Sequence, residues 1–287
     1  MFHWSTQKDH WLFKGEEDLE RLRAAANSAY CEKHAKAAAE KGVQMLSSAE
    51  ERLLCQYFIK KLLEFCNVFE PRVPRSAVAT AAAYFKRFYL NTSAMEYSPR
   101  QIFFCCVYLA FKIDEYVVSV DQFGNTITPD LRQDVVQYVL SHELLLLKRL
   151  KFHLTIHTPF RPMEGFLIDI KTRTPDIPNP DQLRPAAEAF LERSLASDVP
   201  LLYPPSQIAL AALRHGCSHT KISIDGYILS VLFKSEDSEK ADSIMDTLEK
   251  IEEMVLQTVL PDGESVRHIE KKMMKCRVEE LSPPKRY

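Results

Sequence analysis

Apolar residues recur every three or four positions along most of this chain, which is the spacing of an amphipathic α-helix. In residues 51–68, for example, Leu54, Phe58 and Leu62 share one helical face. Patterns of this kind, separated by turns that often contain proline, predict helices over residues 16–41, 51–68, 75–90, 99–112, 120–123, 131–150, 159–171, 181–197, 205–217, 226–233, 240–259 and 264–281. The chain is therefore predicted to be all-α.

The helix predicted over residues 99–112 differs from the others because it is apolar on nearly every side. Such a helix is expected at the centre of a domain, where every face can be buried. Its start carries N-terminal signals: Ser98 can cap it, Pro99 suits the first turn, and Gln101 can reach back in a capping box. Residues 50–155 are thus predicted to form five helices with this one in the middle.

The pattern of this five-helix segment occurs a second time. Pro99-Arg-Gln-Ile102 is matched 106 residues later by Pro205-Ser-Gln-Ile208, and both sequences open an apolar helix. Other helices match at the same spacing, through the pairs Ala81/Ala187, Ala83/Ala189, Tyr84/Phe190, Arg87/Arg193, Glu143/Glu249 and Leu150/Leu256. One spacing shared by three separate helices without a gap predicts two copies of a single unit.

The repeat divides the chain into four expected parts. These parts are an N-terminal arm and helix over residues 1–49, a first repeat over 50–155, a second repeat over 156–260, and a C-terminal helix and tail over 261–287. The arm carries four aromatic side chains that either dock on the rest of the chain or contact a partner: Phe2, Trp4, Trp11 and Phe13.

The composition argues against several classes of protein function. The net charge is −2, whereas a protein built for bare nucleic acid is expected to be basic. There are 7 glycines where average usage would give roughly 20, and no glycine-rich phosphate-binding motif occurs. The 7 cysteines are odd in number and include no Cys-x-x-Cys, which favours reduced thiols over disulfides or a zinc site. No cofactor is expected.

The sequence contains only weak signals for a catalytic site or for a membrane-spanning segment. His215 and His219 have the spacing of two metal ligands on a helix, but the glutamate of an HExxH motif is missing and no nucleophile elbow occurs. The longest apolar run, Ile102–Phe111, is too short to cross a bilayer, and the first residues lack a signal-peptide core. We expect a cytosolic or nuclear protein that is not an enzyme.

Three stretches together resemble the cyclin family. Residues 84–90 (Tyr-Phe-Lys-Arg-Phe-Tyr-Leu) resemble the second helix of the cyclin box. Residues 109–115 contain the family signature Leu-Ala-x-Lys-x-x-Glu, which ends the third helix. Residues 143–154 follow the fifth-helix pattern Glu-x-x-x-Leu-x-x-Leu-x-Phe-x-Leu. The resemblance covers nearly the whole chain and implies an all-α fold of two tandem five-helix cyclin-box repeats with additional N- and C-terminal helices.

The resemblance also implies a function. Cyclins are non-catalytic regulatory subunits that bind the catalytic subunit of a cyclin-dependent kinase and stabilise its active C-helix position. Residues 88–99 and 152–169 are most similar to the cyclins of the CDK-activating kinase and of TFIIH, ahead of the type C transcriptional cyclins. That branch implies a RING-finger assembly factor and the TFIIH core as further partners. It also implies kinase activation loops and the RNA polymerase II tail as substrates, and the nucleus as location.

The resemblance places the kinase-binding residues at the ends of the third and fifth helices: Leu109, Lys112, Ile113, Glu143, Leu147, Leu150 and Phe152. Lys112 ends a buried helix and must reach solvent or a partner, because burying an unpaired ammonium is costly. Lys112 and Glu143 are expected to point together toward the kinase; an ordinary surface ion pair is the alternative. Leu150 and Phe152 could equally belong to the core. Ser218 stands at the position of Lys112 in the second repeat, which is therefore not expected to bind a kinase in the same way.

Two cyclin-like repeats are also found in transcription-factor cores of the TFIIB type, which clamp DNA. That alternative predicts a basic face and an N-terminal zinc ribbon. The near-neutral charge and the lack of Cys-x-x-Cys pairs favour the kinase regulator, with no direct contact to nucleic acid and none to a membrane.

Overall fold

The computed structural model describes residues 2–177, 179–220, 222–233 and 238–276, and these residues contain helices but no β-strand. The all-α prediction is confirmed. The chain forms two compact units. Among the described residues, the first unit consists of residues 13–155 and 260–276, and the second consists of residues 2–12 and 156–259.

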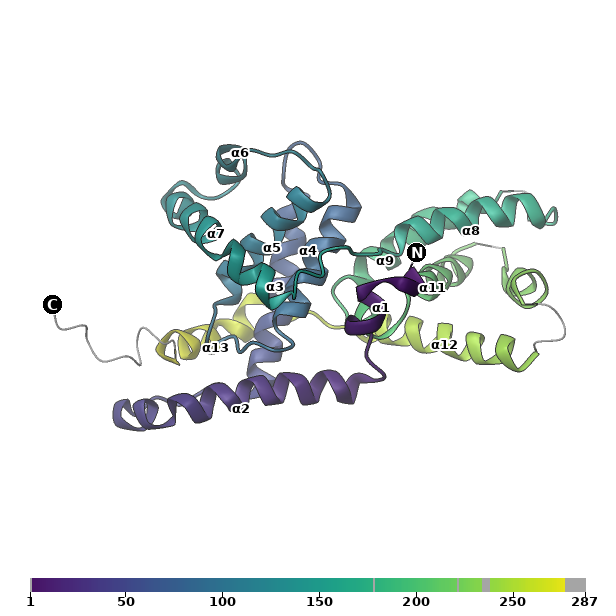
Figure 1. The fold of residues 1–287 in the computed structure, drawn as a ribbon. Coiled ribbons are helices and arrows are strands. Elements are labelled where there is room, and N and C mark those ends of the chain that lie inside the picture. The colour runs from purple at the N-terminus through teal and green to yellow at the C-terminus, as the bar shows by residue number, and fades with distance from the viewer. Residues whose placement is uncertain (1, 178, 221, 234–237, 277–287) are drawn as a thin grey trace. The chain divides into compact units, whose positions relative to one another are not determined.

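The first unit is built around one buried helix. Its helices are α2 (Glu16–Lys41), α3 (Ser48–Asn67), α4 (Arg75–Phe88), α5 (Pro99–Ile113), α6 (Val120–Asn125), α7 (Pro129–Arg149) and α13 (Gly263–Cys276). Helix α5 packs against α3, α4 and α7 (Figure 1). Its residues from Ile102 to Phe111 are buried except Phe104, which is partly exposed. The prediction of a central apolar helix is thus confirmed.

Helices from both ends of the chain complete the first unit. The predicted stripe of α13 is buried, and it consists of Val266, Ile269, Met273 and Cys276. Helix α13 packs on α3, where Lys272 Nζ lies 2.8 Å from a carboxylate oxygen of Glu50. The hydroxyl of Tyr30 in α2 donates to the carbonyl of Cys276 at 2.6 Å. The part of the predicted helix beyond residue 276 lies outside the described residues.

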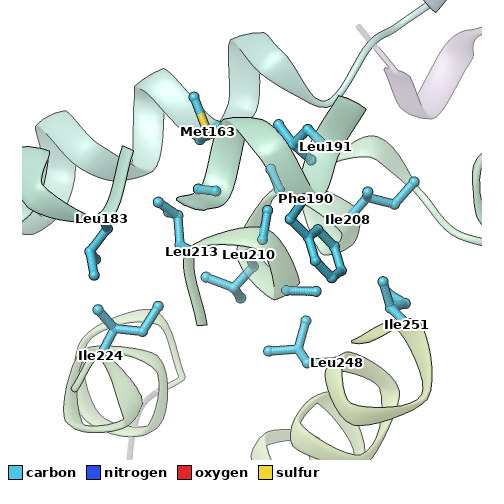
Figure 2. Packing of buried hydrophobic residues seen from close by; sticks show 14 of the residues in the cluster. Met163, Leu183, Phe190, Leu191, Ile208, Leu210, Leu213, Ile224, Leu248 and Ile251 are labelled. Carbon is cyan, nitrogen blue, oxygen red and sulfur yellow. The ribbon is translucent and has the colours of Figure 1, made fainter. Parts of the chain in front are cut away.

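The second unit repeats this plan. Its elements are η1 (Phe2–Trp4), α1 (Thr6–Trp11), α8 (Phe160–Arg173), η2 (Pro180–Leu183), α9 (Arg184–Ser194), α10 (Val199–Leu202), α11 (Pro205–Cys217), the π-helix η3 (Tyr227–Leu232) and α12 (Ser238–Gln257). Helix α11 is central and packs against α8, α9 and α12. Figure 2 shows side chains from these helices converging on one core, with Phe190 near its middle.

The spacing of 106 residues relates the two sets of five helices. It carries α4 onto η2 and α9, α5 onto α11, α6 onto η3, and α7 onto α12. The helix predicted over 181–197 is in fact divided, because its first turn is the 3-10 helix η2 and its end is a turn before α10. The short helix predicted over 226–233 is wound as a π-helix. The two five-helix repeats of the predicted fold are confirmed.

Residues 2–12 pack with the second unit. The side chain of Gln7 clamps the backbone of His157: its amide oxygen accepts from the His157 N–H at 2.7 Å and its amide nitrogen donates to the His157 carbonyl at 3.3 Å. The rings of Phe2 and His157 meet edge to face at 5.7 Å, and Trp11 is buried. Phe2 and Trp11 are thus docked anchors, whereas Trp4 is 90% exposed.

The capping prediction at Ser98 is wrong. Ser98 is buried and its side chain makes no capping hydrogen bond; its carbonyl accepts from the N–H groups of Gln101 and Ile102, both at 3.0 Å. Pro99 does occupy the first turn, where its missing N–H leaves no donor unsatisfied. Complete capping boxes occur instead at α3 and α6, in the pairs Ser47/Glu50 and Ser119/Gln122.

A glycine allows close packing in the second unit. A Cβ at Gly216 in α11 would lie 2.9 Å from the backbone carbonyl oxygen of Leu183, whereas a Cβ at Gly165 in α8 would meet nothing within 4 Å. We expect Gly216→Ala to destabilise the protein by about 1–3 kcal/mol, because the backbone of η2 must move. The matched control Gly165→Ala should stabilise it by about 0.5–1 kcal/mol. Denaturant unfolding of both variants tests this, and equal effects would contradict it.

Candidate functional site

Lys112 and Glu143 form a close ion pair on the surface of the first unit. The ammonium nitrogen of Lys112, at the end of α5, lies 2.7 and 2.8 Å from the two carboxylate oxygens of Glu143 in α7. The Lys112 side chain is 42% exposed and that of Glu143 29%. The structure thus brings together the two predicted polar residues and leaves both accessible to a partner.

An aromatic ring beneath the pair was not anticipated from the sequence. The Lys112 ammonium lies 4.9 Å from the centroid of the Tyr108 ring, one helical turn earlier in α5. This distance is within the range of a cation–π contact. The i, i+4 spacing of Tyr108 and Lys112 was the available signal, because such residues are neighbours on a helix.

The predicted apolar residues divide by exposure. Leu109 and Leu150 are buried, at 3% and 0% exposure, so they lie in the core beneath the surface. Ile113 is 38% exposed, Phe152 is 59% exposed, and Leu147 is half-buried. The accessible apolar part of the candidate site is therefore formed by Ile113, Leu147 and Phe152. Leu109 and Leu150 belong to the buried core of the same unit.

Two further leucines of α7, beyond the predicted residues, are exposed beside the pair. Leu140 and Leu144 are 52% and 56% exposed, and their spacing places them on the face of α7 that carries Glu143 and Leu147. Scattered exposed leucines are ordinary, but a row of them beside a polar pair is typical of a binding surface. A sequence signal was present, since residues 140, 143, 144 and 147 recur at helical spacing.

The backbone after α7 holds Phe152 outward. Lys151 and Phe152 both have positive φ, of 54° and 57°, a region that residues with a side chain seldom adopt. The N–H of Phe152 donates to the Leu147 carbonyl at 3.0 Å and closes the helix end. The Tyr84 hydroxyl donates to the Leu154 carbonyl at 2.6 Å and holds the next residues. A large apolar side chain is thus kept exposed by a defined turn.

A buried arginine supports the same turn. Arg87 in α4, which is 2% exposed, donates to the carbonyl of His153 at 3.1 Å. Its repeat counterpart Arg193 donates to the carbonyl of Leu256 at 2.6 Å, also at the end of a fifth helix. A cation near a helix C-terminus is favourable because unpaired carbonyls gather there. The matched arginines therefore serve the same packing purpose in both units.

The second unit shows no equivalent surface at the positions that match the site, all of which the structure describes. Ser218 stands at the position of Lys112, although Glu249 matches Glu143. The positions of the α7 leucines are taken by exposed charged residues of α12, where Asp246, Lys250 and Glu253 correspond to Leu140, Leu144 and Leu147. The candidate site is thus confined to the first unit.

His215 in α11 and His219, two residues beyond the end of that helix, do not form part of a metal site in the described residues. The rings of His215 and His219 lie 5.2 Å apart, and burial lowers the pKa of His215, with the nearby His219 and Arg193 acting in the same direction. The described part of the chain holds no group of three or more metal-ligating side chains. None of the helices described there is long and apolar enough to span a bilayer.

Comparisons with known families match both units. The family model for the cyclin N-terminal domain matches residues 29–155, and the model for the cyclin C-terminal domain matches residues 158–256. Cyclin-H of Xenopus laevis is 40% identical over 98% of this chain and 88% of its own length. Cyclin-H1-1 of Arabidopsis thaliana is 31% identical over 96% of this chain and 88% of its own length.

Solved structures show the same fold. A chain of the Chaetomium thermophilum CAK complex bound to ATP-gamma-S superposes with a TM-score of 0.82 at 24% identity, covering 96% of this chain and 88% of its own. A chain of the yeast TFIIK complex has a TM-score of 0.68 at 26% identity, covering 88% of this chain and 99% of its own.

Proposed function

Because this chain belongs to the cyclin family, we propose that it is a regulatory subunit that binds a cyclin-dependent kinase and holds that kinase active. The observation that carries the proposal is the Lys112–Glu143 pair, which lies exposed on the first unit beside accessible apolar side chains. Fixed polar groups within an apolar surface are the usual anatomy of a stable protein interface.

The proposed mechanism follows from kinase chemistry. A protein kinase is active only when a lysine of its β-sheet pairs with a glutamate of its C-helix and its activation loop is ordered. A subunit that binds only this arrangement shifts the kinase toward it. Moving a population from mostly inactive to mostly active needs about 5.5 kcal/mol of differential affinity. The cyclin supplies no atom to the phosphoryl transfer.

The polar pair and the apolar side chains have different tasks in this proposal. Lys112 and Glu143 already form an ion pair with each other in the free protein. When the kinase covers them, each can form hydrogen bonds with backbone groups of the kinase and still keep its oppositely charged partner, so no unpaired charge is buried. Leu147, Ile113 and Phe152 supply apolar area around them. Affinity then arises mainly from the apolar contact, and the pair fixes orientation.

The similarity to Cyclin-H proteins extends the proposal to an assembly. We place the chain in a CDK-activating kinase and in TFIIH, with kinase activation loops and the RNA polymerase II tail as substrates of the bound kinase. The solved yeast relative belongs to a TFIIK complex, which supports this setting. A RING-finger assembly factor and the TFIIH core are proposed as further partners, the nucleus as location, and direct contact with nucleic acid or membranes is not part of the function.

Affinity purification of the tagged full chain from its own source tests the function. We expect a cyclin-dependent kinase catalytic subunit to co-purify in equal amount, and the complex to phosphorylate a kinase activation-loop peptide. The chain should pass through a heparin column at moderate salt, because its net charge is −2. A chain that purifies without any kinase and binds heparin would instead support the DNA-binding alternative.

A further inference from the structure

The Lys112 side chain is intrinsically flexible, whereas the proposed site requires its ammonium group to occupy one fixed position. A lysine side chain has four rotatable bonds and loses conformational entropy when it is fixed. Glu143 alone restrains only the tip of the side chain, and an exposed ion pair is a weak restraint. A second contact that restrains Lys112 before the kinase arrives would reduce the cost of binding.

Tyr108 makes that second contact. Its ring lies 4.9 Å from the Lys112 ammonium and is itself 7% exposed, so the face that meets the ammonium is largely shielded from water. A cation–π contact is stronger where the ring and cation are partly desolvated. The ammonium is thus held between an aromatic face and the Glu143 carboxylate.

The ring of Tyr108 is in turn fixed by α6. Phe123 of that helix is 1% exposed, and its ring lies 5.1 Å from the Tyr108 ring at an angle of 58°. Phe123 is anchored by edge-to-face contacts with Phe65 at 5.7 Å and Phe111 at 6.2 Å. A rigid aromatic cluster therefore stands behind the ring that faces Lys112.

The second repeat has neither the lysine nor its support. At the repeat spacing, Arg214 stands for Tyr108, Ser218 for Lys112 and Leu229 for Phe123. Leu229 is 41% exposed, whereas Phe123 is buried. The aromatic support thus occurs in the unit that carries the lysine and not in the other.

We propose that Tyr108 is a positioning residue of the kinase-binding site: its ring, held by Phe123, fixes the Lys112 ammonium beside Glu143 before the kinase binds. This inference rests on the proposed function. It assigns Tyr108 no contact with the kinase, only control over Lys112.

A double-mutant cycle tests the inference. The dissociation constant of the co-purifying kinase catalytic subunit is measured for the full chain and for Tyr108→Leu, Tyr108→Phe, Lys112→Met and Tyr108→Leu/Lys112→Met. We expect Tyr108→Leu to weaken binding about fivefold when Lys112 is present and less than about twofold in the Lys112→Met background. Tyr108→Phe should retain affinity, since it keeps the ring.

A second measurement needs no kinase. In NMR spectra of the free chain, the methylene protons of Lys112 next to the ammonium should be shifted by the ring current of Tyr108. Tyr108→Phe should preserve the shift and Tyr108→Leu should abolish it.

The outcomes separate the inference from the proposed function. Equal weakening by Tyr108→Leu in both backgrounds would overturn the inference, since Tyr108 would then act through core packing alone. Unchanged affinity of Tyr108→Leu, or no ring-current shift, would also overturn it. If Lys112→Met itself leaves kinase binding intact, the proposed site fails and the inference fails with it.

Discussion

Alanine at both Lys112 and Glu143 is expected to weaken kinase binding about thirtyfold or more while the helical fold is kept. Removing a central polar anchor of an interface typically costs 2 kcal/mol or more of binding free energy, and about 1.4 kcal/mol corresponds to tenfold. The fold should survive because both side chains are partly exposed, and a surface pair contributes less than about 1 kcal/mol to folding. Titration of kinase binding and activity, with circular dichroism as the fold check, measures both effects.

A second ion pair of the same unit is a suitable control. Arg52 and Glu20 lie 2.8 Å apart with side chains 39% and 59% exposed, and they belong to α3 and α2 rather than to α5 and α7. Arg52→Ala/Glu20→Ala should leave kinase binding unchanged. If both double variants activate the kinase as the unchanged chain does, the assignment of the site to Lys112 and Glu143 is wrong.

Phe190→Ala is expected to lose about 3–5 kcal/mol of unfolding free energy, the usual cost of truncating a buried aromatic residue. Phe190 is 3% exposed and packs in the core of the second unit (Figure 2). The ring of His215 lies 5.0 Å from the Phe190 ring. Amide exchange measured by mass spectrometry should show protection lost within residues 156–259 and retained around Lys112. Thermal unfolding gives the accompanying loss of stability.

The control for that variant is an exposed apolar residue of the same unit. Ile168 in α8 is 67% exposed, so Ile168→Ala should change stability by less than about 0.5 kcal/mol. A loss at Phe190 no larger than at Ile168 would show that the observed core is not the one that stabilises the unit. Protection lost equally in residues 13–155 would show that the two units unfold together.

The architecture was largely predictable because it depends on repeated local patterns. The match of Pro99 to Pro205 located both central helices, and helical periodicity located most others to within a few residues. The pairing of Lys112 with Glu143 could be foreseen because family resemblance indicated both positions. The helices could be predicted because each is set by residues close together or by a constant spacing, whereas the pair joins two helices and was indicated by the resemblance alone.

Other features could not be foreseen because exposure depends on how helices pack. The sequence gives Leu140, Leu144 and Leu150 similar apolar surroundings, but the first two are exposed and the third is buried. The docking of Gln7 on the backbone of His157 likewise depends on a tertiary contact that leaves no periodic signal. Such contacts are determined by the whole fold rather than by a local pattern.

The terminal segments of the chain contact residues that are synthesised much later or much earlier than they are. Gln7 emerges from the ribosome long before His157, its binding partner, and Tyr30 emerges long before Cys276. The apolar side chains of these N-terminal segments therefore remain exposed to solvent until the distant residues that cover them have been synthesised. A chain whose translation stops before residue 263 would leave exposed the surface of α3 that α13 covers, and chaperones or proteases would recognise it as incomplete.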